Sequence, residues 1–129
     1  MVDKRTAVAV VDDNLGTRMA LRQLLRSMGF DASTFESAED FLAANDHDKF
    51  DCLVVDLHLP GMNGAALVRK LIDCGIRLPA ILITAHDDAP SLKLIRQVAP
   101  VPHLHKPFSD TQLSDALRLV LPAQLRFSK

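Results

Sequence analysis

Five short apolar runs recur along the chain, and an amphipathic segment with helical spacing follows each of them. The runs predict strands over residues 6–11, 30–35, 52–56, 79–84 and 101–105. The segments between them predict helices over 14–28, from Ser37, over 63–74, from Asp87 to before Pro100, and from Ser109 to about Leu121. Strands of nearly continuous apolar character are typical of parallel sheets that are covered on both faces. We therefore expect a doubly wound α/β domain with one parallel sheet.

Capping residues mark the ends of several of these helices. Gly29 and Gly75 stand where a C-terminal glycine commonly ends a helix, and Ser109 with Gln112 has the spacing of a capping box. The helix over 63–74 is expected to bury one apolar face, which comprises Leu67, Val68, Leu71 and Ile72.

The composition favours a single soluble domain over residues 1–129, with a short tail from about 122. The chain has 48% hydrophobic and 24% charged residues, which is the usual balance of a globular protein. A net charge of −1 argues against direct nucleic-acid binding. No apolar stretch approaches the roughly 20 residues needed to cross a bilayer, and no signal-peptide pattern opens the chain. We expect a cytoplasmic location, with Cys52 and Cys74 as reduced thiols.

Polar side chains stand where four of the predicted strands end. Asp12 and Asp13 follow the first strand, Asp56 closes the third, Thr84 closes the fourth and Lys106 follows the fifth. Ligands of open parallel sheets bind at the carboxyl ends of the strands. Three carboxylates, a hydroxyl and an ammonium at that edge can hold a divalent cation together with a phosphoryl group.

These motifs resemble the receiver domain of two-component response regulators, and the resemblance extends over essentially the whole chain. The matching residues are Asp12-Asp13, Asp56 with the segment Leu59-Pro60-Gly61-Met62-Asn63-Gly64, Thr84-Ala85, and Lys106-Pro107-Phe108. The stretch from Gly29 to Leu42 is more narrowly similar to the receivers of FixJ-type transcriptional regulators. The resemblance implies a flavodoxin-like (βα)5 fold with strand order 2-1-3-4-5.

The resemblance also implies a phosphorylation switch. Asp56 would accept a phosphoryl group from a sensor histidine kinase, a phosphotransfer protein or a small donor such as acetyl phosphate. Asp13 and Asp56 would bind Mg²⁺ directly, Asp12 would bind it through water, and the backbone carbonyl of His58 would be a further ligand. The protein would catalyse only its own phosphorylation and dephosphorylation, and it would not act as an enzyme on other substrates.

Three further residues would contact the phosphoryl group itself. By resemblance, Lys106 would pair with the phosphoryl oxygens, while the Thr84 hydroxyl and the Ala85 backbone N–H would donate hydrogen bonds to them. The Lys106–Pro107 peptide is expected to be cis. The signal would leave through the face of the fourth helix, the fifth strand and the fifth helix, by homodimerisation or by binding another protein.

Several histidines depart from the pattern of this family. His103 stands where receivers commonly carry Phe or Tyr, and it is either a switch residue or an exposed strand histidine without such a role. His58 and His86 lie two residues past Asp56 and Thr84, where side chains of the family flank the phosphoryl group, so the resemblance implies an acyl-phosphate lifetime that varies between about pH 5.5 and 7.5. A transition-metal site that also includes His105 is a weaker hypothesis, because the spacings match no standard ligand motif.

Other functions are also compatible with parts of the pattern. The chain is either the receiver of a longer transcriptional regulator or a receiver that acts alone through protein contacts. An aspartyl-phosphate hydrolase would usually need a second acid two residues after the nucleophile, where this chain has His58. An unphosphorylated flavodoxin-like interaction module is the main alternative. Such a module would not need the polar residues at the strand ends, all of which are present here: Asp12, Asp13, Asp56, Thr84 and Lys106.

Overall fold

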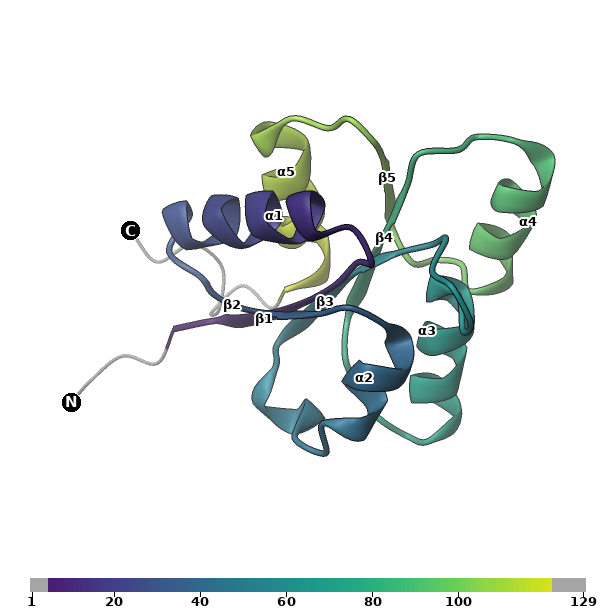
Figure 1. The fold of residues 1–129 in the computed structure, drawn as a ribbon, viewed down its shortest axis with the longest axis horizontal. Helices are drawn as coiled ribbons and strands as arrows, with labels where there is room; N and C mark the ends of the chain where they lie inside the picture. Colours follow the sequence, from purple (N-terminus) through teal and green to yellow (C-terminus); the bar gives the residue numbers. More distant parts are fainter. Residues whose placement is uncertain (1–4, 122–129) are drawn as a thin grey trace.

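A five-stranded parallel sheet forms the centre of the molecule, in a computed structural model that describes residues 5–121 (Figure 1). The strands are β1 (Ala7–Val11), β2 (Asp31–Phe35), β3 (Cys52–Asp56), β4 (Ala80–Thr84) and β5 (His103–His105). Their order across the sheet is β2-β1-β3-β4-β5, and every neighbouring pair is parallel. The predicted flavodoxin-like strand order is confirmed.

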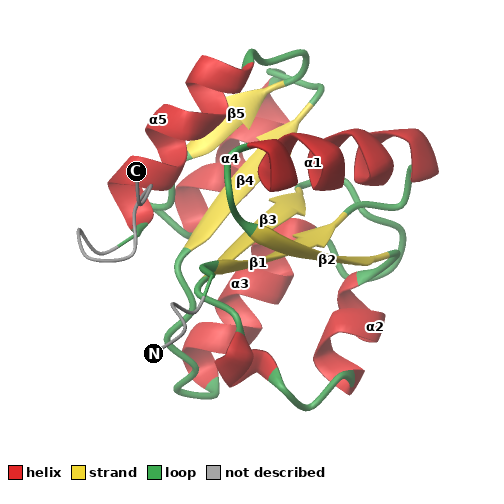
Figure 2. Cartoon of the chain, turned by 90° about the vertical axis from the view of Figure 1, so that its left-hand side faces the viewer, coloured by secondary structure: helices red, strands yellow, loops and turns green. Residues whose placement is uncertain are grey.

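Helices cover both faces of the sheet (Figure 2). They are α1 (Leu15–Ser27), α2 (Ala38–Ala43), α3 (Gly64–Asp73), α4 (Ala89–Gln97) and α5 (Asp110–Val120). A 3-10 turn, η1 (His47–Lys49), precedes β3 and was not expected from the sequence. Among the helices of residues 5–121, none has both the length and the apolar character needed to span a membrane.

Alternate side chains of the central strands enter two separate cores. Val8 and Val10 of β1 pack in the core beneath α1 and α5, with Leu25 and Leu117 among its fully buried members. Ala9 and Val11 face the opposite way and pack with residues of α2, α3 and α4. Because both of their faces are buried, the central strands β1, β3 and β4 are almost continuously apolar, whereas the edge strands β2 and β5 carry polar and exposed residues.

Side-chain caps fix the starts of the five α-helices. Each N-cap side chain accepts a hydrogen bond from a backbone N–H in the first turn, and these residues are Asn14, Ser37, Asn63, Asp88 and Ser109. The capping box of Ser109 with Gln112 is confirmed. Gly29 and Gly75 follow α1 and α3 with φ of 96° and 74°, a conformation that favours glycine.

Two expectations about local structure are wrong. Ile72 is 51% exposed, because it lies one position beyond Leu71 and about 100° further round α3, outside the buried face that Leu67, Val68 and Leu71 form. The fifth strand begins at His103 rather than at residue 101. Val101 and Pro102 instead belong to the loop after α4, which contains a cis Ala99–Pro100 peptide. The expected tail from 122 lies outside the described residues.

Candidate functional site

Three carboxylates meet at the carboxyl edge of the sheet. Asp12 and Asp13 follow β1, and Asp56 ends β3, the strand paired beside it. One ligand oxygen from each residue lies within 4.8 Å of those of the other two. Asp12 is completely buried and Asp56 is 7% exposed, whereas Asp13 is exposed. The structure thus brings together the three residues that the sequence singled out as a cation site.

Lys106 supplies the balancing positive charge. Its Nζ lies 3.1 Å from Asp12 Oδ2 and 3.3 Å from Asp56 Oδ2. Burial raises the pKa of Asp56 above its ordinary value, and the His58 N–H and Lys106 only partly oppose this effect. Burial by itself would lower the pKa of Lys106, but the two carboxylates reverse this and leave the pKa raised. The ammonium is therefore charged at neutral pH. The peptide bond between Lys106 and Pro107 is cis, as expected.

The β1–α1 loop is held in place by Arg18, a residue that the sequence reasoning missed. Its Nη1 donates a 2.7 Å hydrogen bond to the Asp12 backbone carbonyl, and its Nη2 lies 3.8 Å from Glu36 Oε2. The Asn14 N–H donates to Asp12 Oδ1 at 2.9 Å. One signal was present in the sequence, because Arg18 is three residues before Leu21 and seven before Leu25, on the apolar face of α1.

The loop after Asp56 is packed tightly against it. The His58 N–H donates a 3.1 Å hydrogen bond to Asp56 Oδ1. A Cβ added at Gly64 would lie 2.5 Å from the Asp56 backbone oxygen, so only glycine fits there without a shift. On the outer side, Glu39 of α2 accepts a 3.0 Å hydrogen bond from the Met62 N–H, and this bond lowers the pKa of Glu39.

Thr84 ends β4 with its hydroxyl turned toward the following loop. Oγ1 donates to the His86 carbonyl at 2.9 Å and accepts from the His86 N–H at 2.9 Å. The residue is 2% exposed, and Ala85 beside it is exposed. In this state the hydroxyl is thus engaged by the loop backbone.

The histidines near this edge fall into two groups. The rings of His58 and His86 meet edge to face, with 4.7 Å between centroids, and His58 Nε2 lies 2.8 Å from Ser91 Oγ. His103 and His105 are exposed on β5, and a switching role for His103 stays a prediction. Within residues 5–121, the Asp12, Asp13 and Asp56 group is the only convergence of three potential metal ligands, so the transition-metal hypothesis gains no support.

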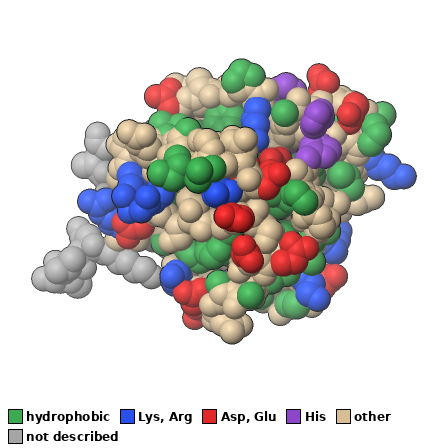
Figure 3. Space-filling view, viewed as in Figure 1, with side chains coloured by type: hydrophobic (Ala, Val, Ile, Leu, Met, Phe, Trp, Pro, Cys, Tyr) green, Lys and Arg blue, Asp and Glu red, His purple; other side chains and the backbone are tan. Residues whose placement is uncertain are grey.

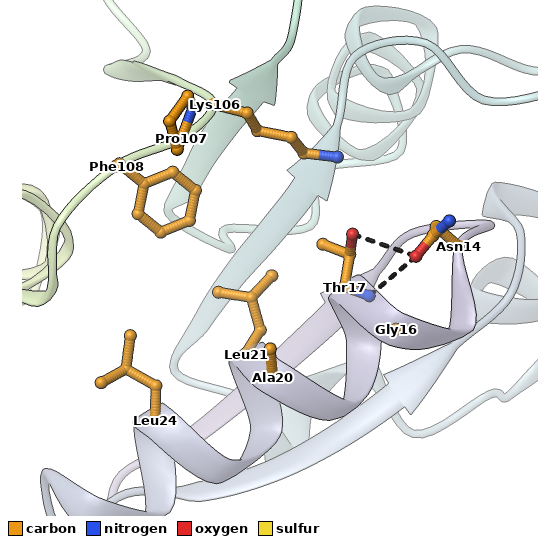
Figure 4. A pocket seen from close by; sticks show the side chains of 9 residues that line it. All are labelled: Asn14, Gly16, Thr17, Ala20, Leu21, Leu24, Lys106, Pro107 and Phe108. Carbon is orange, nitrogen blue, oxygen red and sulfur yellow. Dashed lines mark hydrogen bonds between the residues drawn. The ribbon is translucent and has the colours of Figure 1, made fainter.

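An apolar groove of about 570 Å³ begins beside Lys106 (Figure 4). It runs between α1 and the loop after β5, where the Phe108 ring faces Leu21 and Leu24. In Figure 3 the acidic side chains gather near the centre of the visible face, and histidines lie toward the upper right. The surface around the site is therefore divided into acidic, apolar and histidine-rich areas.

The donor set fits Mg²⁺. Carboxylate oxygens are the hard ligands that this ion prefers, and it is commonly held by one or two carboxylates while keeping several waters. Asp13 is exposed and the Asp56 side chain is 10% exposed, whereas Asp12 is buried; Lys106 contacts both Asp12 and Asp56. His58, whose backbone carbonyl was expected to be a further ligand, lies in the loop that follows Asp56.

Comparisons with known proteins agree with this geometry. The family model of the response regulator receiver domain matches residues 8–118. Nodulation protein W of Bradyrhizobium diazoefficiens is 36% identical over 88% of this chain and 50% of its own length. The transcriptional regulatory protein FixJ of Rhizobium meliloti is 37% identical over 85% of this chain and 54% of its own length. The chain thus spans about half the length of these curated relatives.

Solved structures agree as well. The crystal structure of FixJ-N superposes with a TM-score of 0.78 at 35% identity, covering 90% of this chain and 93% of that one. The response regulator StyR gives a TM-score of 0.78 at 36% identity, covering 92% of this chain and 60% of that one. The similarity to FixJ-type receivers is confirmed.

Proposed function

The chain belongs to the response regulator receiver domain family, and from that premise we propose that it is a phosphorylation-controlled switch with Asp56 as the phosphoacceptor. The observation that carries the proposal is the cluster of Asp12, Asp13 and Asp56 with Lys106 bridging two of its members. Carboxylates held this close repel one another unless cations neutralise them. A divalent cation and a phosphoryl group are ligands that such a cluster can accept together.

In the proposed reaction, an Asp56 carboxylate oxygen attacks the phosphorus of a phosphohistidine. The new P–O bond forms as the P–N bond breaks, and the imidazole of the donor leaves with the electron pair. Bound Mg²⁺, held by Asp13, Asp56 and the His58 carbonyl, with Asp12 acting through water, would neutralise charge on the phosphoryl oxygens. The reaction modifies the protein itself, so we propose no activity on other substrates.

Lys106 and Thr84 would stabilise the transferred group. The Lys106 ammonium is already 3.3 Å from Asp56 and needs only a short movement to pair with a phosphoryl oxygen. Thr84 would exchange its hydrogen bond to the His86 carbonyl for one to the phosphoryl group, and the Ala85 N–H would add a second donor. This exchange would change the β4–α4 loop, so it would link chemistry to conformation.

The output surface is proposed to be the face of α4, β5 and α5. Leu119 is 77% exposed and Leu92 is 37% exposed, and His103 and His105 are exposed on β5 between these helices. Homodimerisation or the binding of another protein would cover these side chains. Because the relatives include the transcriptional regulatory protein FixJ, of which the match covers 54%, we propose that the domain controls such a regulator in the cytoplasm.

A Mg²⁺ titration with and without beryllofluoride, a mimic of the phosphoryl group, tests the proposal. Calorimetry should detect one Mg²⁺ site that is lost in Asp13→Asn, and beryllofluoride should bind only when Mg²⁺ is present. Asp87→Asn, which changes an exposed acid in the β4–α4 loop, is the matched control. Absence of both binding events in the wild type would favour the unphosphorylated interaction module instead.

A further inference from the structure

Ser91 links helix α4 to the loop that follows Asp56. It lies in the first turn of α4 and is completely buried, although it is polar. Its backbone N–H donates to the Asp88 cap at 2.9 Å, and its hydroxyl also interacts with the Asp88 carboxylate, so that Ser91 lowers the pKa of Asp88. The same hydroxyl oxygen lies 2.8 Å from Nε2 of the His58 ring.

His58 and His86 connect this hydroxyl to both reactive residues of the proposed site. The His58 backbone N–H donates to Asp56 Oδ1, and the His58 ring contacts the His86 ring edge to face. The His86 backbone in turn both donates to and accepts from the Thr84 hydroxyl. The orientation of the His58 ring therefore depends on one buried hydroxyl of α4.

We propose that Ser91 is a positioning residue that holds the His58 ring on α4 and so lengthens the lifetime of the acyl phosphate on Asp56. The inference rests on the proposed function of Asp56. While Nε2 is engaged by Ser91, it is not free to bind a water molecule beside the phosphoryl group. The hydroxyl thereby protects the phosphorylated state against hydrolysis.

The protected step is hydrolysis of the acyl phosphate. A water oxygen forms a bond to phosphorus, the P–O bond to Asp56 breaks, and the electron pair returns to the Asp56 carboxylate. Inorganic phosphate leaves, and a proton of the water passes to solvent. A released His58 ring would accept a hydrogen bond from that water and orient it, and such orientation accelerates attack.

The same contact makes the lifetime sensitive to the position of α4. A partner that moves the first turn of α4 would lengthen or break the hydrogen bond between His58 and Ser91. The effect is reciprocal, because a contact that couples two sites changes the properties of both. The output face would therefore influence how long the signal lasts as well as receive it.

A double-mutant cycle tests the inference. Wild type, Ser91→Ala, His58→Ala and the double variant are phosphorylated with acetyl phosphate and Mg²⁺, desalted, and followed by intact mass over time. Ser91→Ala should shorten the lifetime about two- to tenfold, the range that an ordinary hydrogen bond corresponds to. In the His58→Ala background the same substitution should change nothing, because Ser91 acts through His58. Ser114→Ala, on α5, is the matched control.

Three results would overturn the inference. They are an unchanged lifetime in Ser91→Ala, an equal shortening in the His58→Ala background, and a shortened lifetime in His58→Phe. The last variant leaves Ser91 intact and gives a flat ring without nitrogen, so it keeps the test valid if Ser91→Ala does not fold. Wild type that gains no phosphoryl group would instead contradict the proposed function, and this inference would fall with it.

Discussion

The Lys106 ammonium lies 3.1 Å from Oδ2 of Asp12, a side chain that is only 1% exposed. The corresponding distance to Asp56 is 3.3 Å. A fully buried carboxylate is costly unless it is paired and hydrogen-bonded, and Lys106 with the Asn14 N–H meets this requirement for Asp12. Lys106 therefore has a structural task before phosphorylation in addition to its proposed task afterwards.

Replacing Lys106 with Met should strengthen Mg²⁺ binding. The ammonium now neutralises the carboxylates that the ion would bind, so its removal leaves more negative charge for Mg²⁺. We expect the Kd to fall about fivefold, since one charge at 4 Å contributes about 1 kcal/mol even in water. Calorimetry measures the Kd, with Lys70→Met on the exposed side of α3 as the control. An unchanged or weaker affinity would show that Lys106 does not set the charge of the site.

Arg18→Met should weaken both the fold and the cation site. Its loss leaves the Asp12 carbonyl without this buried donor, which typically costs about 1–3 kcal/mol in free energy of unfolding. Chemical denaturation measures that cost, and a Mg²⁺ titration should give a larger Kd because the Asp12-Asp13 backbone is no longer held. Arg26→Met, at an exposed position of the same helix, should do neither. Equal effects of the two substitutions would exclude the positioning role.

Gly64→Ala should destabilise the protein more than Gly16→Ala. The added Cβ at Gly64 would lie 2.5 Å from the Asp56 backbone oxygen and 3.0 Å from Leu57 Cα, and the backbone can relieve this only by moving Asp56. Overpacking of this kind commonly costs about 1–3 kcal/mol. At Gly16 the nearest atom is the Asn14 side-chain oxygen at 3.2 Å. Thermal unfolding of both variants gives the comparison, and equal stability would contradict the tight packing of α3 on the Asp56 loop.

The two thiols should differ sharply in reactivity. Burial raises the pKa of Cys52 to about 12, whereas Cys74 is exposed at the end of α3. At pH 8 a thiol with a pKa of about 12 is ionised to only about one part in ten thousand, and the thiolate is the reactive form. Ellman's reagent should therefore titrate one thiol in the native protein and two in denaturant, and Cys74→Ser should abolish the fast reaction. Rapid reaction of both native thiols would contradict the burial of Cys52.

The raised pKa of Cys52 also makes the stability of the protein depend on pH. The folded state keeps the Cys52 proton to higher pH than the unfolded state, whose thiol titrates near 9.0. Between pH 9 and 12 the folded protein thus binds more protons, and the contribution of Cys52 to stability falls as the pH rises. Denaturation midpoints of wild type and Cys52→Ala, compared at pH 8 and pH 10, should show a steeper loss for the wild type.

Much of the fold was predictable because periodicity and capping act locally. Apolar runs buried on both faces, the Ser109–Gln112 capping box and the glycines after α1 and α3 each report on a few neighbouring residues. The cation site was predictable because parallel strands bring their carboxyl ends to one edge. Ile72 shows the limit of this reasoning, since the width of a buried helix face depends on what packs against it.

The contacts that support the site were harder to predict. Arg18 and Ser91 are polar residues on apolar helix faces, a signal that indicates burial but does not identify the partner. Glu39 carries no sequence signal, because its bond to the Met62 N–H depends on how α2 approaches the loop after β3. Such contacts join residues far apart in the chain, and only the three-dimensional packing determines them.

Intact-protein mass after incubation with acetyl phosphate, with and without Mg²⁺, tests the central claim most directly. The account predicts a gain of one phosphoryl group that requires Mg²⁺, is labile to alkali and is absent in Asp56→Asn. A gain that persists in Asp56→Asn, or one that is independent of Mg²⁺, would contradict the assignment of Asp56 as the phosphoacceptor of this site.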